Sequence, residues 1–341
     1  MQFDTDLKRK QAGMAKKRID WLDIAKGVTM ILVIVGHTVN NPSPVRTIIF
    51  SFHMPLFFLL AGYTFRVKPW KEVLSSSLTR LLVPYLLLAL SWRIPLLLAS
   101  GAPLDGSAIG GLLGTLLFAS GTVVQPFGFN AVGPTWFLVA LFVSRLALNG
   151  LLMLFERLRA SVLMQGLACA VIAIAGLAWS NVLGVYLPLD VDLCYYTVVL
   201  MWIGYMARKH NVPLSLGTWH VAVGALLVWA ACMQFSSLEL AARRLDNPVV
   251  ATFGAIAGTY VMCWLSMALE HAKDLPVLGT LERFLVFCGN ASMAIFCVHA
   301  IDWMFPWSAF PQIMALPFAG AIASAIRSAC DVALAYVIKK A

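Results

Sequence analysis

A lysine and a histidine stand at the two ends of one apolar run. Ten uncharged residues separate them in Asp23-Ile-Ala-Lys26-Gly-Val-Thr-Met-Ile-Leu-Val-Ile-Val-Gly-His37. In a helix this spacing corresponds to roughly 16 Å, which is about half the hydrocarbon thickness of a bilayer. Imidazole titrates near neutral pH and can act as a base or a nucleophile. We therefore expect a path that starts at a cation near one membrane surface and ends in chemistry at His37.

The composition indicates the class of protein. Of 341 residues, 60% are hydrophobic and 12% are charged, and the mean hydropathy is +0.83. Soluble domains contain about 25% charged residues, so the chain is predicted to be an integral membrane protein. The net charge is +9, but the basic residues lie mainly between apolar spans, which argues against nucleic-acid binding. The seven cysteines lack metal-binding spacing, so they are expected to be small buried side chains, and no metal is expected.

Ten segments are long and apolar enough for membrane-spanning helices. They are 24–40, 46–65, 78–100, 134–155, 162–180, 191–207, 217–236, 249–270, 284–305 and 314–338. An eleventh run at 108–124 is short and rich in glycine, which favours a re-entrant or interfacial segment. The predicted fold is an all-α polytopic membrane protein with about ten transmembrane helices and this one short segment.

The distribution of Lys and Arg predicts the orientation. With ten spans and a cytoplasmic N-terminus, 19 of the 25 basic residues fall on the cytoplasmic side, and both termini lie inside. The intramembrane polar residues then form an outer group (His37, His53, Asp192, His299 and Asp302) and an inner basic rim (Lys26 and Arg80). The domain organisation expected is a basic cytoplasmic segment at 1–22, a single transmembrane domain at 23–338 and a cytoplasmic tail at 339–341.

A series of motifs, in order along the chain, points to a family. They are Arg18-Ile-Asp-Trp-Leu-Asp-Ile-Ala-Lys-Gly with the later Val-Gly-His37, Ser51-Phe-His-Met-Pro-Leu-Phe-Phe-Leu-Leu-Ala-Gly62, Arg80-Leu-Leu-Val-Pro-Tyr85, Gly133-Pro-Thr-Trp-Phe-Leu138, Leu189-Asp-Val-Asp192 through Gly204-Tyr205, and Gly289-Asn-Ala-Ser292 through His299. Through them the chain resembles the acyltransferase 3 family of bacterial membrane acyltransferases, particularly its fucose 4-O-acetylase-like branch. Two positions depart from the family pattern: Ala61 stands where Ser is common, and Ser77 replaces the first Arg of an Arg-x-x-Arg pattern.

The resemblance implies a membrane O-acyltransferase of the bacterial cytoplasmic membrane. Its donor would be cytoplasmic acetyl-CoA, and its acceptor a hydroxyl of a cell-envelope or exported glycan or of a lipid-linked precursor. His37 is then the expected catalytic residue, either as the base that deprotonates the hydroxyl or as the group that carries the acyl. The acceptor sugar, the acyl length and the oligomeric state are not predicted.

The resemblance also suggests which residues hold the substrates. The residues expected to bind the phosphates of CoA are Lys26, Arg66, Lys68 and Arg80. The residues expected to line the site or support His37 are Asp23, His53, Trp136, His299 and Asp302. Structural roles stay open beside these, because histidines often join membrane helices, Trp is common at interfaces, and Asp23 and Lys26 can neutralise each other at i,i+3 spacing.

Other readings of the same features remain. A secondary transporter or flippase is the main alternative, although we find no inverted repeat and no paired broken helices. A catalytically silent scaffold is a third, which the intact spacing from Lys26 to His37 disfavours. The ion pairs expected within the spans are Arg327 with Asp331, and Arg93 and Arg145 with Asp192 or Asp302.

Overall fold

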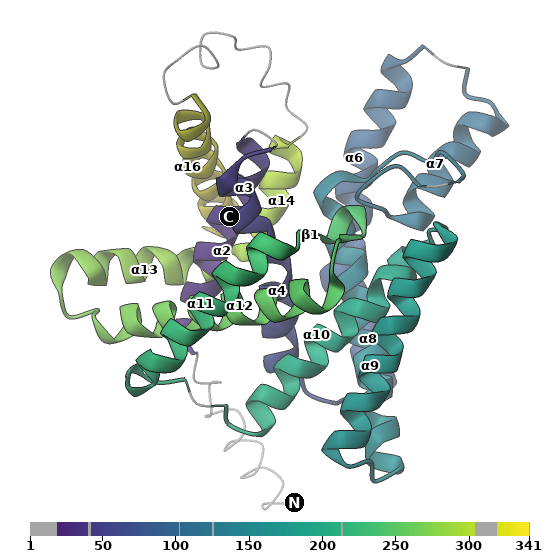
Figure 1. Cartoon of the computed structure of the whole chain (residues 1–341). Helices are drawn as coiled ribbons and strands as arrows, with labels where there is room; N and C mark the ends of the chain where they lie inside the picture. Colours follow the sequence, from purple (N-terminus) through teal and green to yellow (C-terminus); the bar gives the residue numbers. More distant parts are fainter. Residues whose placement is uncertain are drawn as a thin grey trace, which may run out of the picture.

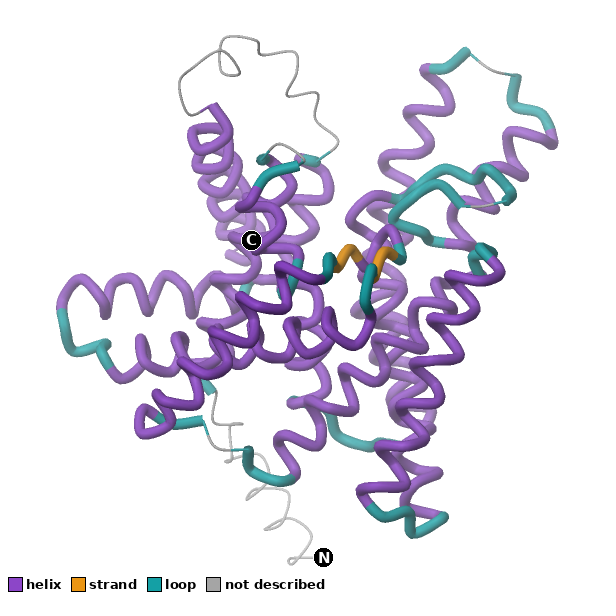
Figure 2. The backbone as a smooth tube through the Cα atoms, in the orientation of Figure 1, coloured by secondary structure: helices purple, strands orange, loops and turns teal. Residues whose placement is uncertain are grey.

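The protein is almost entirely helical, as Figures 1 and 2 show. The computed structural model describes residues 19–39, 42–101, 103–124, 126–212, 214–303 and 319–340. Among these residues the sheet is limited to a two-stranded antiparallel hairpin, β1 (Leu238–Glu239) with β2 (Arg244–Leu245). The helical class predicted from the sequence is confirmed.

Eight helical segments among the described residues are long and apolar enough to cross a membrane. They are α2 (Asp20–Thr38), α3 with α4 (Pro44–Phe50 and His53–Tyr63), α5 with α6 (Trp70–Ser77 and Val83–Ala99, joined by a π-helical turn at Leu78–Leu82), α8 (Trp136–Arg157), α10 (Val191–Lys209), α11 (Trp219–Phe235), α12 (Pro248–His271) and α16 (Ala319–Lys340). Each coincides with a predicted span, because an apolar run in lipid satisfies its backbone hydrogen bonds by forming a helix. A multi-pass membrane protein follows.

The predicted span at 284–305 is not one straight helix. Instead α13 (Pro276–Asn290) and α14 (Ser292–Asp302) form a pair bent by 74°. Gly289 and Asn290 are weak helix formers, and Gly289 also lies against the backbone of α2, which explains why the bend falls here. The described residues thus hold eight candidate crossings, or nine if the bent pair is one of them, and the predicted count of ten is not confirmed.

Two shorter apolar helices accompany these segments. α7 (Gly106–Phe118) has 13 residues, or about 20 Å at the α-helical rise, which is too short to cross a bilayer. It lies where a short segment was predicted at 108–124. α9 (Val162–Ala178) has 17 residues and continues into a π-helical turn at Trp179–Leu183, at the place of a predicted span.

Glycines bring two pairs of helices into backbone contact. A Cβ atom on Gly27 would overlap the backbone of α13, and one on Gly289 would overlap the backbone of α2. Gly62 of α4 and Gly204 of α10 permit the same close approach between their helices. Small residues at crossings are a common means of close packing between membrane helices. The helices α2 and α4 are therefore held tightly by their neighbours.

Three helices from the two ends of the chain meet around the candidate site. α14 and α16 pack on each other, and both contact α2. Figure 1 shows α8 and α9 on the right, and α10 packs on both of them and on α4. The fold thus brings the C-terminal helices next to the end of α2 that carries His37.

Several predictions concern the ends of the chain. Residues 1–18, 304–318 and 341 lie outside the described residues. The basic segment predicted at 1–22, the tail at 339–341 and the cytoplasmic position of both termini therefore stay predictions. The boundaries of the transmembrane domain at 23–338 stay a prediction as well.

Candidate active site

One face of α2 carries both Lys26 and His37. The two residues are eleven positions apart, and at about 100° per residue they point within about 20° of the same direction. Met30 and Val33 lie between them on this face, and all four side chains line cavities. The spacing therefore makes one stripe along the helix, with a cation at one end and an imidazole at the other.

Two cavities follow this stripe. The Lys26 cavity has a volume of about 200 Å³, and its lining is largely apolar and comes from α2, α4, α8 and α14. The His37 chamber is smaller, about 40 Å³, and includes His37, His53 and Trp136 in its wall. The side chains that line both are Val33, Met54, Phe137 and Phe296. The two cavities are therefore adjacent along the stripe, a succession that is called the passage below, and these apolar side chains form the boundary between them.

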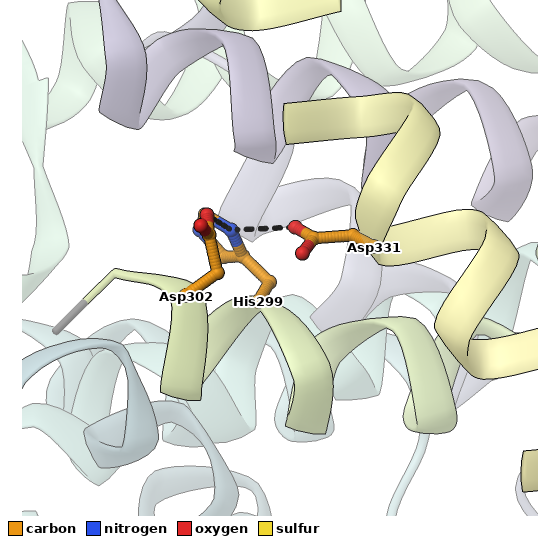
Figure 3. Close-up of side chains that lie close together, drawn as sticks. All are labelled: His299, Asp302 and Asp331. Atoms are coloured by element: carbon orange, nitrogen blue, oxygen red, sulfur yellow. Dashed lines mark hydrogen bonds and ion pairs between the residues drawn. The ribbon is translucent and has the colours of Figure 1, made fainter. Parts of the chain in front are cut away.

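His37 is the first member of a hydrogen-bonded chain that leads away from the chamber. Its Nδ1 lies 3.1 Å from Nε2 of His299 on α14. Nδ1 of His299 lies 3.2 Å from Oδ2 of Asp331 on α16, the contact drawn in Figure 3. The side chains of His299 and Asp331 are 0% and 1% exposed, so this part of the hydrogen-bonded series is shielded from water.

The carboxylate at the end of this chain decides where the protons lie. When Asp331 is ionised its carboxylate only accepts hydrogen bonds, so Nδ1 of His299 donates to it. Nε2 of a neutral His299 is then an acceptor, which makes Nδ1 of His37 the donor between the two rings. Nε2 of His37 keeps its lone pair, and this is the state that a general base or a nucleophile requires.

Arg327 of α16 binds next to this chain. Its Nε donates to Oδ2 of Asp302 at 2.6 Å, and its Nη1 donates to Oγ1 of Thr38 at 3.1 Å. The predicted pairing of Arg327 with Asp331 is wrong, because Asp302 reaches Arg327 from α14 while Asp331 faces His299. The expectation that His299 and Asp302 share a face is confirmed, although 3.9 Å is too long for a hydrogen bond. Since Arg327 balances Asp302, Asp331 is available to balance positive charge on the imidazoles.

His53 and Trp136 line the His37 chamber, as expected of site residues. Nδ1 of His53 donates to the carbonyl of Ile49 at 2.9 Å, which leaves its Nε2 as an acceptor. The ring of Phe50 contacts both histidines, with centroids 5.9 Å from His37 and 4.6 Å from His53. The chamber therefore combines two imidazoles with an aromatic wall.

The four basic residues predicted to bind CoA separate into two groups. Lys26 lines its cavity, and its Nζ lies 2.6 Å from Oδ1 of Asp23, so the expected pair at i,i+3 spacing is confirmed. Arg66, Lys68 and Arg80 are exposed and do not line the Lys26 cavity. The structure thus brings one of the four to the passage and leaves three on the surface.

The acidic residue at the start of α10 has a partner that was not predicted. Arg243, in the loop before α12, donates from Nε to Oδ2 of Asp192 at 2.9 Å and also pairs with Asp190. Burial by itself lowers the pKa of Arg243, but the two carboxylates outweigh burial and raise the pKa above its ordinary value. The prediction that Asp192 would pair with Arg93 or Arg145 is wrong.

Sequence reasoning also missed Asp331 as the partner of His299. The signal present was an acidic residue within an apolar segment, which membrane proteins keep for interior sites. The i,i+4 spacing to Arg327 pointed instead to a pair within one helix. The contact between α14 and α16 decides the matter, and local spacing carries no information about that contact.

The same cluster has the dimensions of a metal site. Ligand atoms of His299, Asp302 and Asp331 lie within 4.8 Å of one another, and Figure 3 shows the three side chains together. Two of these groups already have other partners, since His299 bridges to His37 and Asp302 binds Arg327. A divalent cation would have to compete with the guanidinium. The absence of a metal requirement stays a prediction, and incubation with a chelator tests it.

Comparisons with known proteins place this geometry in a family. Residues 19–329 match the acyltransferase domain family, a range that includes the α2 stripe, the chamber and His299. No curated protein and no solved structure gives a match. The match covers the family as a whole and does not single out a fucose 4-O-acetylase-like branch. Because the matched range covers most of the chain, the protein belongs to the acyltransferase 3 family and is a membrane acyltransferase.

Proposed function

We propose that the protein is an O-acyltransferase that moves acetyl from cytoplasmic acetyl-CoA to a hydroxyl of a cell-envelope or exported glycan, or of its lipid-linked precursor. The observation that carries this proposal is the passage along α2. It has a lysine at one end and, at the other, an imidazole whose Nε2 is available for chemistry. We also propose that the protein lies in the bacterial cytoplasmic membrane with both termini in the cytoplasm. Within its family we propose the fucose 4-O-acetylase-like branch.

The Lys26 cavity suits the donor. CoA combines phosphates with a long, thin arm, and Lys26 supplies positive charge at the cavity while the apolar lining suits the arm. An arm that follows the stripe for roughly 16 Å, the helical rise over eleven residues, presents its thioester at His37. The surface residues Arg66, Lys68 and Arg80 are proposed as further contacts for the phosphates.

The chemistry at His37 couples proton transfer to acyl transfer. In the direct route, Nε2 takes the proton of the acceptor hydroxyl while the hydroxyl oxygen attacks the thioester carbonyl carbon. The C–O bond forms, the C–S bond breaks, and the proton passes from His37 to the thiolate of CoA. In the covalent route, Nε2 attacks first and releases the thiolate, and the hydroxyl then takes the acyl group and gives its proton to the thiolate.

Both routes place positive charge on His37. The hydrogen bond from its Nδ1 to His299, and from there to Asp331, stabilises that charge. The buried carboxylate therefore supports either route, and the proposal depends on His37 rather than on the choice between them.

Labelled acetyl-CoA and purified protein test the proposal. The wild type is expected to transfer or hydrolyse the acetyl group, and His37→Ala is expected to lose at least about 100-fold in rate, the usual worth of a positioned base. His210→Ala, at an exposed turn after α10, is the matched control and is expected to keep full activity. Wild-type activity in a folded His37→Ala protein would exclude His37 as the catalytic group. A wild-type protein that neither transfers nor hydrolyses the acetyl group would contradict the proposed function. Substrate flux without any need for CoA would indicate a transporter instead.

A further inference from the structure

A third cavity continues the passage beyond His37. This cavity, called the vestibule here, has a volume of about 120 Å³ and lies between α3 and the β1–β2 hairpin. Phe50 and Glu239 line both the vestibule and the His37 chamber. The passage therefore extends from the Lys26 cavity through the chamber to the vestibule, and each cavity shares side chains with the next.

Arg46 contacts both side chains that the vestibule and the chamber share, Phe50 and Glu239, which are called the partition below. Its Nη2 donates to Oε1 of Glu239 at 2.9 Å, and its Nη1 donates to the carbonyl of Gly36 at 3.0 Å. Its guanidinium carbon lies 3.7 Å from the centroid of the Phe50 ring. Because Gly36 directly precedes His37 and Phe50 contacts its ring, these interactions connect the partition to the reaction centre.

The contacts of this partition are exchangeable. The side chains of Arg46 and Glu239 are 18% and 28% exposed, so water reaches both partners of this half-buried pair. The neighbouring pair of Arg243 with Asp192 is different, since those side chains are 5% and 0% exposed. A polar molecule in the vestibule can therefore replace the contacts of Arg46 and Glu239 without disturbing the buried pair.

The lining of the vestibule suits a sugar with an anionic group. Its polar side chains include Arg46, Ser51, Ser236, Ser237, Glu239 and Arg244. The hydroxyls of Ser51, Ser236 and Ser237 donate to Ile48, Asn247 and Asp246, so they offer a sugar acceptor oxygens only. Within the lining two guanidiniums stand against one carboxylate, and the Asp246 carboxylate beside it is bound by Ser237. Arg244 pairs with Glu239 through the backbone of the hairpin, while its guanidinium makes no hydrogen bond or ion pair with the described residues. It is thus available to an anion.

We propose that the vestibule is the acceptor subsite. It binds a sugar that carries a carboxylate or a phosphate, and the pair of Arg46 with Glu239 opens when a sugar hydroxyl enters the His37 chamber. This inference rests on the proposed function, because it assigns the acceptor to the end of the passage that the donor does not use. The apolar Lys26 cavity, by contrast, has few polar groups for a sugar.

Opening of the partition can be measured without acyl transfer. Diethyl pyrocarbonate modifies accessible imidazoles, and peptide mass spectrometry reports His37 separately from the other histidines. Glu239→Gln keeps the size of the side chain and removes the ion pair. We expect modification of His37 to become up to about fivefold faster, the change in open population that ~1 kcal/mol produces. Glu156→Gln makes the same change at an exposed position of α8 that lines none of the three cavities, and it is expected to leave the rate unchanged.

Two matched sugars test the binding chemistry. Glucuronate is expected to protect His37 from modification at a concentration severalfold lower than glucose, and Arg244→Ala is expected to remove this difference. An unchanged rate in Glu239→Gln, or equal or absent protection by the two sugars, overturns the subsite. These measurements need no turnover. If they succeed while the wild-type protein neither transfers nor hydrolyses acetyl, the proposed function fails and the binding site stands.

Discussion

Nδ1 of His37 lies 3.1 Å from Nε2 of His299, across 262 positions of the chain. This contact joins the first described helix to α14 and extends the site to Asp331, a carboxylate that does not line the His37 chamber. The arrangement resembles the acid–histidine pairs that hold a base in one tautomer in hydrolases. Here a second imidazole stands between the acid and the base.

Asp331→Asn is expected to lower the rate of acetyl transfer by about 10- to 100-fold, the usual effect of losing such a supporting hydrogen-bond partner. The KM for acetyl-CoA is expected to stay within about twofold, because Asp331 does not line the Lys26 cavity. Initial rates over a range of acetyl-CoA concentrations measure both. Cys330→Ala, at the exposed neighbouring position, is the control. A fall in affinity with an unchanged maximal rate would assign Asp331 another role.

Arg327→Gln is expected to destabilise the protein by about 3–5 kcal/mol, because removing one partner leaves a nearly buried carboxylate unbalanced. The side chains of Arg327 and Asp302 are 6% and 13% exposed. The double variant Arg327→Gln with Asp302→Asn is expected to lose less. Thermal unfolding in detergent measures the effect.

An exposed ion pair provides the control for this experiment. Lys68 and Glu72 are 51% and 59% exposed, so Lys68→Gln is expected to cost under about 1 kcal/mol. Equal losses in Lys68→Gln and Arg327→Gln would mean that the buried pair is not specially stabilising.

Prolonged incubation with EDTA is expected to leave both transfer rate and unfolding midpoint unchanged. In the cluster of His299, Asp302 and Asp331, Asp302 already accepts a hydrogen bond from Arg327 and His299 is already bonded to His37. These groups therefore need no metal ion as a partner. Elemental analysis of the purified protein is the companion measurement. Loss of activity that zinc restores would identify the cluster as a metal centre.

Lys26→Ala is expected to raise the KM for acetyl-CoA about tenfold, the equivalent of one hydrogen bond to a charged group. Lys26→Arg, which keeps the charge, is expected to lose less. Lys209→Ala, at the exposed end of α10, serves as the matched control. If Lys26→Ala instead lowers the maximal rate at constant KM, the donor does not bind at this lysine.

Gly204→Ala is expected to destabilise the protein by about 1–3 kcal/mol, because the added methyl group forces α10 away from α4. Gly224→Ala in α11 meets no neighbouring atom within 4 Å and is expected to be neutral or stabilising, since alanine favours a helix over glycine. The two unfolding midpoints, measured side by side, test the packing of α4 on α10. Equal midpoints would show that the helices can separate at little cost.

Local patterns predicted the features that depend on one helix at a time. The class of protein follows from composition, and most membrane segments follow from apolar runs whose length matches the bilayer. The stripe from Lys26 to His37 also depends only on the period of α2. The i,i+3 pair of Asp23 with Lys26 is local in the same sense, and the structure contains it.

Features that depend on packing between distant segments were not predictable in this way. Asp331 lies four positions from Arg327, yet both residues of α16 bind α14 instead. Asp331 contacts His299, and Arg327 donates to Asp302. The pair of Arg46 with Glu239 joins α3 to the hairpin across 193 positions. The bend between α13 and α14 coincides with the contact of Gly289 on α2, which is again a tertiary cause.

The succession of three cavities along one passage has a kinetic consequence. On the proposed assignment the donor binds at the Lys26 end and the acceptor in the vestibule, so the two substrates approach His37 from different sides. Product CoA then competes with acetyl-CoA for one end but not with the sugar at the other. Steady-state inhibition by CoA is then expected to be competitive toward the donor and noncompetitive toward the acceptor, because the two ligands can occupy the protein at the same time.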